Sequence, residues 1–418
     1  MSDNLPKWKR ALRFDSVFYL DMLFLYMATS LFGRRYATYP LIVLGLWLIH
    51  TLARAHTRRL LLDTVRGRYR VLAIAGLVLL YGILNYASTT INGGRANAWD
   101  GWERVTGWLF CGLAGVCLAS IHPPTGIYRR FCRWQAAMLL LLSGIIVGSA
   151  LGWVPFVRLG VLDFKTKIDT ILEMLVLAAY VNAIAGTDLP KRDRILQGLA
   201  LAAGMAGILV MGTSRLLIPV LALGILLAAW VGRNRALALA PAVVALLGLT
   251  AFLLRPEAVR ALTGIQLTDP LYWRLKILNH RDILWQLSLV MFATQPWWGV
   301  GPGNFARVSE ATRQALGIAD PSGQQYIHAH NIWWNPFVAC GIFAGLTHTL
   351  LMIYVLGLTL VRLEEKRTRA LALNLLMIWL VYQFYGLVEL APTMEEIIPY
   401  VWGGTGLLAG TVAAPDHS

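Results

Sequence analysis

With 418 residues, of which 57% are hydrophobic and only 14% are charged, this chain is too apolar to be a soluble globular protein. The formal net charge of +15 does not indicate nucleic-acid binding, because the basic residues form short clusters between apolar stretches and no basic face carries interleaved aromatic residues. We therefore interpret the chain as an all-α polytopic membrane protein. Its four cysteines show no metal-ligand spacing and are expected to be reduced packing residues: Cys111, Cys117, Cys132 and Cys340.

Apolar stretches close to the roughly 20 residues that a bilayer requires predict twelve membrane spans. The first stretch lacks a small-residue cleavage site, so we expect an uncleaved anchor and not a signal peptide. The spans are expected at about 17–33, 37–54, 70–88, 104–122, 134–153, 170–187, 193–212, 215–232, 236–254, 344–362, 370–389 and 396–413.

Clusters of lysine and arginine precede the first span and then fall on alternate connections, for example at Arg129–Arg133 and Lys191–Arg194. Such clusters mark cytoplasmic loops, so both termini are expected in the cytoplasm. The predicted organisation is spans one to nine over residues 1–254, a large loop with short helices over 255–343, and spans ten to twelve over 344–418. The large loop then faces the periplasm of a Gram-negative inner membrane.

The stretch from Arg255 to Asn331 is the only long polar interruption of the chain. Loops of this length in compact architectures are usually functional or disordered. Disorder is not expected here, because the loop contains Trp273, Trp285, Trp297 and Trp298. We therefore expect the chemistry of the protein in this loop.

Several basic residues are predicted on the translocated side, against the usual charge bias. Solvated or snorkelling side chains are one explanation, and the binding of an anionic ligand is another. Arg215 favours the second, because it lies between two apolar stretches, and a buried guanidinium requires an anionic partner such as a phosphate or diphosphate. This group includes Arg34, Arg35, Arg158, Lys165, Lys167 and Arg215, and in the long loop Arg255, Arg260, Arg274, Lys276, Arg281, Arg307 and Arg313.

The loop closes on His328-Ala329-His330-Asn331. Asn331 is a suitable N-cap for a short helix that ends before Gly341, which would place His330 at the positive end of that helix. A neutral imidazole there can act as a general base. A capping or packing role for His330 is equally compatible with these residues. His328 and His330 without a third nearby ligand are a weak metal signal, and we expect no metal.

The spacing of His330-Asn331, nine residues and then Gly341 resembles the His-[Asn/Ser/Gln]-x9-Gly signature of O-antigen ligases and related polymerases. The segments Arg281–Trp285 and Pro296–Phe305 are similar to that family's loop, in which a helix that begins with an arginine leads into a glycine turn. Thr213-Ser214-Arg215 resembles the family's Arg-x3-Leu element, but Pro219 stands at the leucine position. The span number and the GT-C-like topology are also similar.

The resemblance implies a metal-independent, inverting glycosyltransferase of the bacterial inner membrane that needs no cofactor. Its donor would be an O-antigen glycan on undecaprenyl diphosphate, and its acceptor a hydroxyl of the lipid A-core. His330 would deprotonate the acceptor, while arginines neutralise the leaving diphosphate in place of a metal ion. The expected substrate-binding residues are Arg215 and Arg281, then Arg158, Arg34 and Arg35, with His328 and Asn331 beside them.

Three alternatives remain open. The chain could be an O-antigen polymerase or a protein O-oligosaccharyltransferase, although the Arg-x10-Gly elements typical of two-loop polymerases do not begin in the long loop or in the fifth connection. A secondary transporter is disfavoured because the two halves of the chain do not repeat each other and polar residues concentrate in one loop. A scaffold protein would not require a neutral histidine beside outer arginines.

Overall fold

The computed structural model describes residues 17–30, 34–55, 58–59, 69–93, 98–153, 165–184, 189–211, 220, 223–228, 257, 260–261, 281–318, 326–387 and 397–411. Over these ranges the secondary structure is helical and contains no strand. The elements are α2 (Val17–Ser30), α3 (Arg34–Ala53), α5 (Tyr69–Ile91), α6 (Ala98–Ile121), α7 (Pro124–Ala150), α8 (Lys165–Ile184), α9 (Lys191–Met211), α14 (Arg281–Thr294), η3 (Pro302–Asn304), α15 (Phe305–Ala315), α16 (Asn335–Cys340), α17 (Ile342–Glu364), α18 (Arg369–Tyr385), η5 (Pro399–Gly403) and α19 (Gly404–Gly410).

The protein is an all-α polytopic membrane protein. Ten of the twelve predicted spans overlap helices of the structure, whereas those at 215–232 and 236–254 lie largely outside the described residues. The number of twelve therefore stays a prediction. Among the residues that the structure describes, five helices are long and apolar enough to cross a bilayer: Tyr36–Ala53, Tyr69–Ile91, Pro124–Ala150, Lys191–Val210 and Ile342–Glu364.

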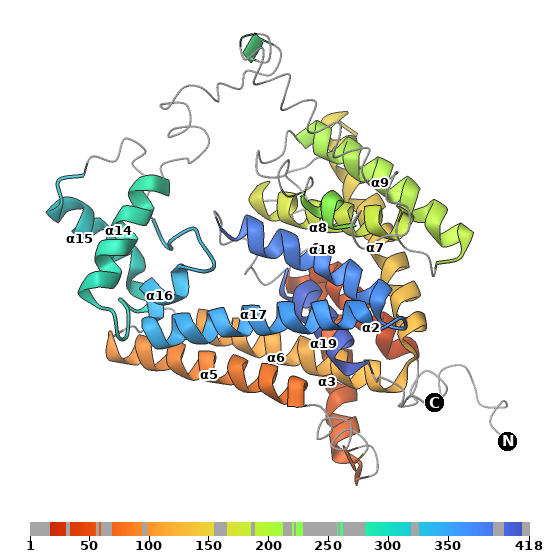
Figure 1. Cartoon of the computed structure of the whole chain (residues 1–418), viewed down its shortest axis with the longest axis horizontal. Helices are drawn as coiled ribbons and strands as arrows, with labels where there is room; N and C mark the ends of the chain where they lie inside the picture. Colours follow the sequence, from red (N-terminus) through yellow and green to blue (C-terminus); the bar gives the residue numbers. More distant parts are fainter. Residues whose placement is uncertain are drawn as a thin grey trace.

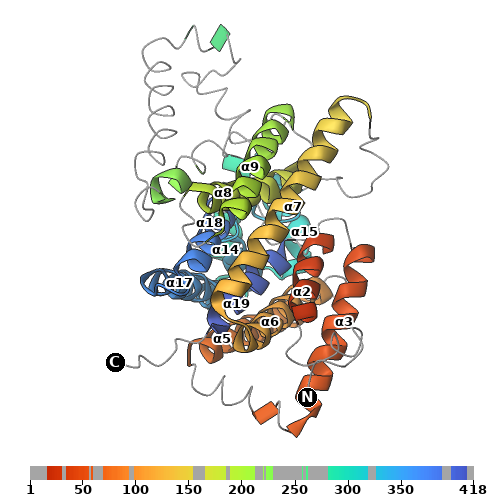
Figure 2. The same cartoon turned by 90° about the vertical axis from the view of Figure 1, so that its right-hand side faces the viewer.

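Helices α5, α6 and α17 run side by side across the molecule, and the short helices α14 to α16 gather at one end of them (Figure 1). Helices α7, α8 and α9 pack together beside α18, as the view turned by 90° also shows (Figure 2). The core between these groups is rich in aromatic residues. The indoles of Trp108 and Trp402 are stacked with centroids 4.7 Å apart, and Trp379 meets Trp402 edge-on at 5.8 Å.

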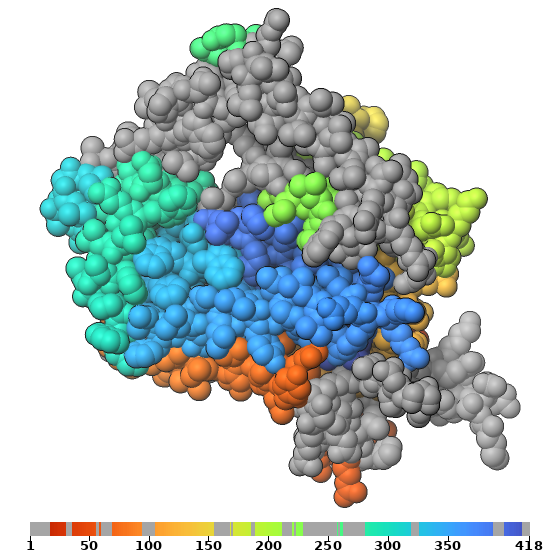
Figure 3. Space-filling model, viewed as in Figure 1, coloured from red at the N-terminus to blue at the C-terminus, as the bar shows by residue number. Residues whose placement is uncertain are grey.

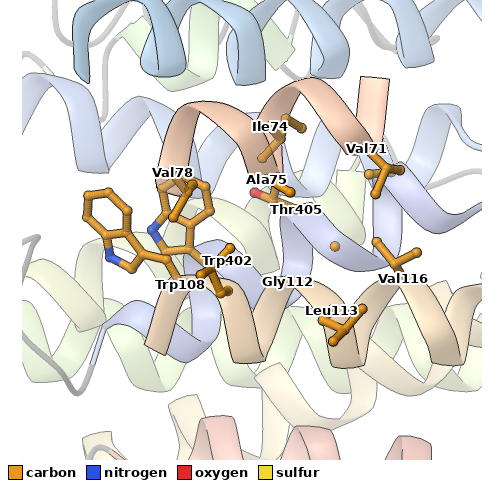
Figure 4. A pocket seen from close by; sticks show the side chains of 13 residues that line it. Val71, Ile74, Ala75, Val78, Trp108, Gly112, Leu113, Val116, Trp402 and Thr405 are labelled. Carbon is orange, nitrogen blue, oxygen red and sulfur yellow. The ribbon is translucent and has the colours of Figure 1, made fainter. Parts of the chain in front are cut away.

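Glycines allow α6 and α19 to pack backbone against backbone. A Cβ atom at Gly406 would lie 2.2 Å from the carbonyl oxygen of Gly112, and one at Gly115 would lie 2.6 Å from that of Gly403. Small residues commonly permit such close helix pairs in membranes. A cavity of about 300 Å³ lies where α5 meets this pair, and its lining is almost entirely apolar (Figure 4). Lining residues include Val71, Val78, Trp108, Val116, Trp402 and Thr405.

One end of the bundle, here called the basic end, is held by ion pairs. Asp193 at the start of α9 accepts hydrogen bonds from Arg129 and Arg133 of α7, at 2.7 and 2.9 Å. Asp21 of α2 forms an ion pair with Arg130 at 2.7 Å, and at the end of α17 Arg362 forms one with Glu365 at 2.6 Å. The residues of the basic end are Asp21, Arg129, Arg130, Arg133, Asp193, Arg362 and Glu365.

The position of these arginines corrects the predicted boundary of the fifth span. We expected Arg129–Arg133 in a connection, with the span beginning at about 134, but α7 begins at Pro124. Proline suits the first turn of a helix, where its missing N–H has no intrahelical partner. The arginines can lie on the helix because Asp193 and Asp21 neutralise them. Similarly, Arg34 and Arg35 begin α3 and do not lie in the turn before it.

The opposite end, here called the signature end, carries α14, α15, α16 and the first turn of α17 (Figure 3). Helix α17 has 23 residues, so at 1.5 Å per residue about 33 Å separates its two ends. The basic clusters and the signature residues thus lie at opposite ends of the bundle. The four cysteines are free and buried, which confirms their predicted packing role.

Candidate functional site

A contact between two glycine turns forms the base of the signature end. The segment after α14 lies against the end of α16, with hydrogen bonds from Val300 N to Val338 O at 3.0 Å and from Ile342 N to Pro296 O at 2.8 Å. Gly341 has φ +84°, and a Cβ atom there would lie 2.1 Å from the carbonyl oxygen of Trp297. Gly299 has φ +64°, and a Cβ atom there would lie 2.6 Å from the carbonyl carbon of Ala339. The glycine of the signature is therefore required by backbone packing.

Helix α5 fastens this glycine contact to the bundle. The hydroxyl of Ser88 lies 2.6 Å from the carbonyl oxygen of Trp298 and 3.1 Å from that of Ala339, so it bridges both turns. One turn further on, the carbonyl oxygen of Asn92 accepts a hydrogen bond from the Asn304 side chain at 3.0 Å. The role of Ser88 was not predictable from the sequence, because its hydrogen-bond partners are 210 and 251 residues away and no local pattern connects them.

His330 lies in the turn that precedes α16. Its φ is +46°, and it is the one residue other than glycine with positive φ within the described ranges. Residues with a Cβ atom seldom adopt this left-handed conformation, and where they do it often marks a functional position. The side chain is half-buried, whereas its neighbour Ala329 is fully buried. The turn thus presents the imidazole at the surface of the signature end.

Asn331 caps this turn, although the helix begins later than predicted. Its Oδ1 accepts hydrogen bonds from the backbone N–H groups of Trp333 and Trp334, both at 2.9 Å, as an N-cap does. Regular helix begins only at Asn335, four residues beyond the predicted cap, because Pro336 fits the first turn of α16. His330 is therefore separated from the start of α16 by one irregular turn.

The same turn is tied to the end of α18. The side chain of Asn331 donates to the carbonyl oxygen of Leu387 at 2.9 Å, and the N–H of Ile332 donates to that of Gly386 at 2.7 Å. On the other side, Asn335 Oδ1 accepts the N–H of Ala329 at 3.0 Å. Asn335 was not singled out from the sequence, although an asparagine before a proline is a common turn signal.

His328 contacts His330 directly. The ring centroids are 4.2 Å apart, and Nδ1 of His328 accepts a hydrogen bond from the backbone N–H of His330 at 3.2 Å. An imidazole can accept at Nδ1 only when that nitrogen carries no proton. Within the described residues, no group of three or more histidine, cysteine, aspartate or glutamate side chains is arranged to hold a metal ion.

Arg281 is the first residue of α14, as the sequence resemblance implied. Leu284, one turn further along the same helix face, belongs to the hydrophobic cluster that contains Ala329. The aromatic ring of Phe292 packs against Trp334, with centroids 5.1 Å apart. The sequence that follows Arg281 therefore packs on the turn that carries His330.

The other predicted arginines are not placed by the structure. Arg215 and Arg158 lie outside the described residues. Arg34 and Arg35 begin α3, but their side chains lie outside the described part as well. The structure thus brings the α14 sequence that begins at Arg281 together with His328, His330 and Asn331, and leaves the remaining four arginines as predictions.

The apolar cavity beside Trp108 and Trp402 does not belong to this site. It begins beside Val78, and ten residues of α5, about 15 Å of helix, separate Val78 from Ser88 at the glycine contact. Its lining contains no charged side chain that would bind a diphosphate.

Two comparisons with known proteins bear on this geometry. Residues 200–349 match the protein family described as O-antigen ligase. The matched segment contains Arg215, Arg281, the two histidines and Gly341. No curated protein matched the chain.

Proposed function

From the match of residues 200–349 to the O-antigen ligase family, we propose that this protein is a membrane glycosyltransferase of the ligase or polymerase type, and specifically an O-antigen ligase. It transfers a glycan from undecaprenyl diphosphate to a hydroxyl of the lipid A-core. The reaction takes place on the periplasmic side of the inner membrane, inverts the anomeric centre and requires no metal ion.

His330 is the general base in this proposal. The acceptor hydroxyl loses its proton to the imidazole while its oxygen attacks the anomeric carbon, and the bond from that carbon to the diphosphate breaks. Such assistance is typically worth about 10² to 10⁴ in rate. The observation that carries the proposal is the left-handed His330 in a turn tied to Gly386, Leu387 and Asn335, at the end of the bundle opposite the basic clusters.

Arginines provide the positive charge for the leaving diphosphate. Arg281 is proposed because α14 packs against the catalytic turn, and Arg215 because the matched segment contains it at the head of a predicted span. A guanidinium group binds phosphate oxygens through two parallel hydrogen bonds, which a lysine cannot do. Arg158, Arg34 and Arg35 are proposed as further contributors to the same anionic site.

The membrane boundary supports a lipid-linked donor. Trp297 is 62% exposed and stacks on Phe343, which is 47% exposed, with centroids 5.9 Å apart. Exposed tryptophans commonly mark the level of the lipid headgroups. Both residues adjoin Gly341, so the signature end lies at this level, where the diphosphate of a donor anchored by its lipid chain would also lie.

The proposal is tested with the purified protein and a polyprenyl-diphosphate glycan. Rough lipopolysaccharide and a protein acceptor are offered in parallel reactions, and gel analysis shows which acceptor is modified. Ligation to lipopolysaccharide is expected, and turnover is expected to be unchanged in excess chelator. Transfer to protein alone, or extension of the donor glycan without an added acceptor, would instead identify a protein oligosaccharyltransferase or a polymerase.

The proposed role of Arg281 is tested by comparing the same substitution at two arginines of the signature end. Arg281→Lys keeps the charge but loses the planar fork, so we expect a fall in activity of roughly 10-fold or more. Arg307 of α15 is also at the signature end but is exposed, and Arg307→Lys should retain activity. Equal activity of both variants would remove Arg281 from the diphosphate site.

A further inference from the structure

The turn that carries His330 is held almost entirely through backbone N–H groups. Six such groups between Ala329 and Asn335 have hydrogen-bond acceptors, at distances from 2.7 to 3.2 Å. Five of these bonds end on amide or carbonyl oxygens, and Asn331 Oδ1 accepts two of them. The sixth bond ends on an imidazole nitrogen. In chain order, the acceptors are Asn335 Oδ1 for residue 329, His328 Nδ1 for 330, Gly386 O for 332, Asn331 Oδ1 for 333 and 334, and Asn331 O for 335.

We propose that His328 is a positioning residue for His330, and that it acts through the lone pair of its Nδ1 atom. The inference rests on the proposed role of His330 as the base. The bond runs from the backbone N–H of the left-handed residue to the side chain two positions earlier. It therefore closes a small ring through Ala329 that fixes the peptide plane on the N-terminal side of His330. The bonds of residues 332, 333 and 334 fix the chain on its C-terminal side, so φ of His330 is held between the two.

The restraint is needed because of the conformation. A residue with a Cβ atom is strained at φ +46° and relaxes to negative φ unless its surroundings hold it. Relaxation would rotate the imidazole of His330 away from its present direction. The two rings are also in contact, at 4.2 Å and an angle of 57°, so His328 limits the orientation of the second imidazole as well.

The proposal fixes the chemical form of His328. Only a neutral imidazole with its proton on Nε2 can accept a hydrogen bond at Nδ1. Nδ1 of His328 therefore takes part in neither proton transfer nor metal binding, because its lone pair already accepts the hydrogen bond from the N–H of His330. This provides a role for the histidine that the O-antigen ligase signature does not include.

Two substitutions separate this role from a direct contact with substrate. Asparagine carries an oxygen at the same number of bonds from Cα as His Nδ1, so His328→Asn can accept the same hydrogen bond, and His328→Ala cannot. In the transfer assay we expect His328→Ala to lower kcat roughly 10- to 100-fold, with KM for the donor within about threefold. His328→Asn should retain kcat within about threefold of wild type.

Wild-type kcat in the alanine variant would overturn the proposal. So would an asparagine variant as slow as the alanine variant, because the imidazole ring would then act on the substrate directly. Both results leave the proposed function intact as long as the wild type transfers glycan and His330→Ala does not.

Hydrogen exchange tests the inference without any substrate. Amides of residues 326–335 should exchange faster in His328→Ala than in wild type, and at the wild-type rate in His328→Asn, while amides in the middle of α17 stay unchanged in both. Unchanged exchange in the alanine variant would show that the bond does not hold the turn. If the wild type transferred no glycan but this exchange pattern appeared, the proposed function would fail while the structural role stood.

Discussion

The two ends of the bundle are held together by different kinds of contact. At the basic end, side chains do the holding: Asp193 is 4% exposed and joins α9 to two arginines of α7. At the signature end, backbone atoms do most of it, through the glycine contact and the turn tied to Gly386. The charged groups of a buried ion pair neutralise each other and are not available to bind a ligand. Backbone contacts, in contrast, hold a surface in place and leave its charged side chains available. This difference is the one expected if the proposed chemistry takes place at the signature end and the basic end serves to hold the helices together.

The largest expected effect is on catalysis at the signature end. Removal of the base in His330→Ala should lower kcat by about 10² to 10⁴, since the acceptor hydroxyl would have to lose its proton without assistance. His50 at the end of α3 is exposed and serves as the matched histidine, and His50→Ala should transfer glycan at the wild-type rate. Initial rates at saturating donor measure both. Ligation by purified His330→Ala at the wild-type rate would end the general-base assignment.

The glycine contact provides the second test. Gly341→Ala combines a positive φ, which costs roughly 1–2 kcal/mol for a residue with a Cβ atom, with an atom 2.1 Å from the carbonyl oxygen of Trp297. Gly317 has φ +63° but no heavy atom within 4 Å of the added Cβ. Gly317→Ala therefore reports the cost of the backbone conformation alone.

We expect Gly341→Ala to lower both Tm and activity, and Gly317→Ala to lower Tm slightly while activity persists. Thermal unfolding in detergent and the transfer assay measure the two effects. Similar losses in both variants would mean that the close backbone approach at Gly341 contributes nothing beyond its φ.

Breaking the basic end should affect stability and spare catalysis. Asp193→Asn removes the charge that two arginines share, and the arginines are 48% and 45% exposed, so solvent takes over part of the lost interaction. We expect a loss of about 1–3 kcal/mol in the free energy of unfolding. The kcat of the molecules that remain folded should stay within about threefold of wild type. A selective loss of kcat without a change in Tm would contradict the division between the two ends.

The sequence predicted the features that are local. Hydrophobic stretches of nearly constant length predicted helices, and the resemblance to the O-antigen ligase loop implied the helix that begins at Arg281 and leads into a glycine turn. The structure of the turn that carries His330 was not predictable in this way. The positive φ of His330 depends on acceptors at Gly386 and His328, and the need for Gly341 depends on Trp297, which is 44 positions earlier in the chain. Such constraints arise only when distant segments meet.

The smallest effect is expected from the ion pair between Glu310 and Arg313 of α15. Glu310 accepts hydrogen bonds from Arg313 and Gln314, which lower the pKa of its carboxyl group from 4.5 to about 2. A lowered pKa means that the stabilisation is fully present above pH 4.5 and is lost as the pH falls through about 2.

At pH 7, Glu310→Gln should leave Tm and kcat within experimental error, because the pair lies in solvent and water replaces the lost hydrogen bonds. The same carboxylate-to-amide change at Asp193 should be clearly destabilising, since that carboxylate is buried. An equal fall in Tm for both variants would mean that ion pairs matter as much at the signature end as at the basic end, and that the backbone contacts there are not what fixes the site.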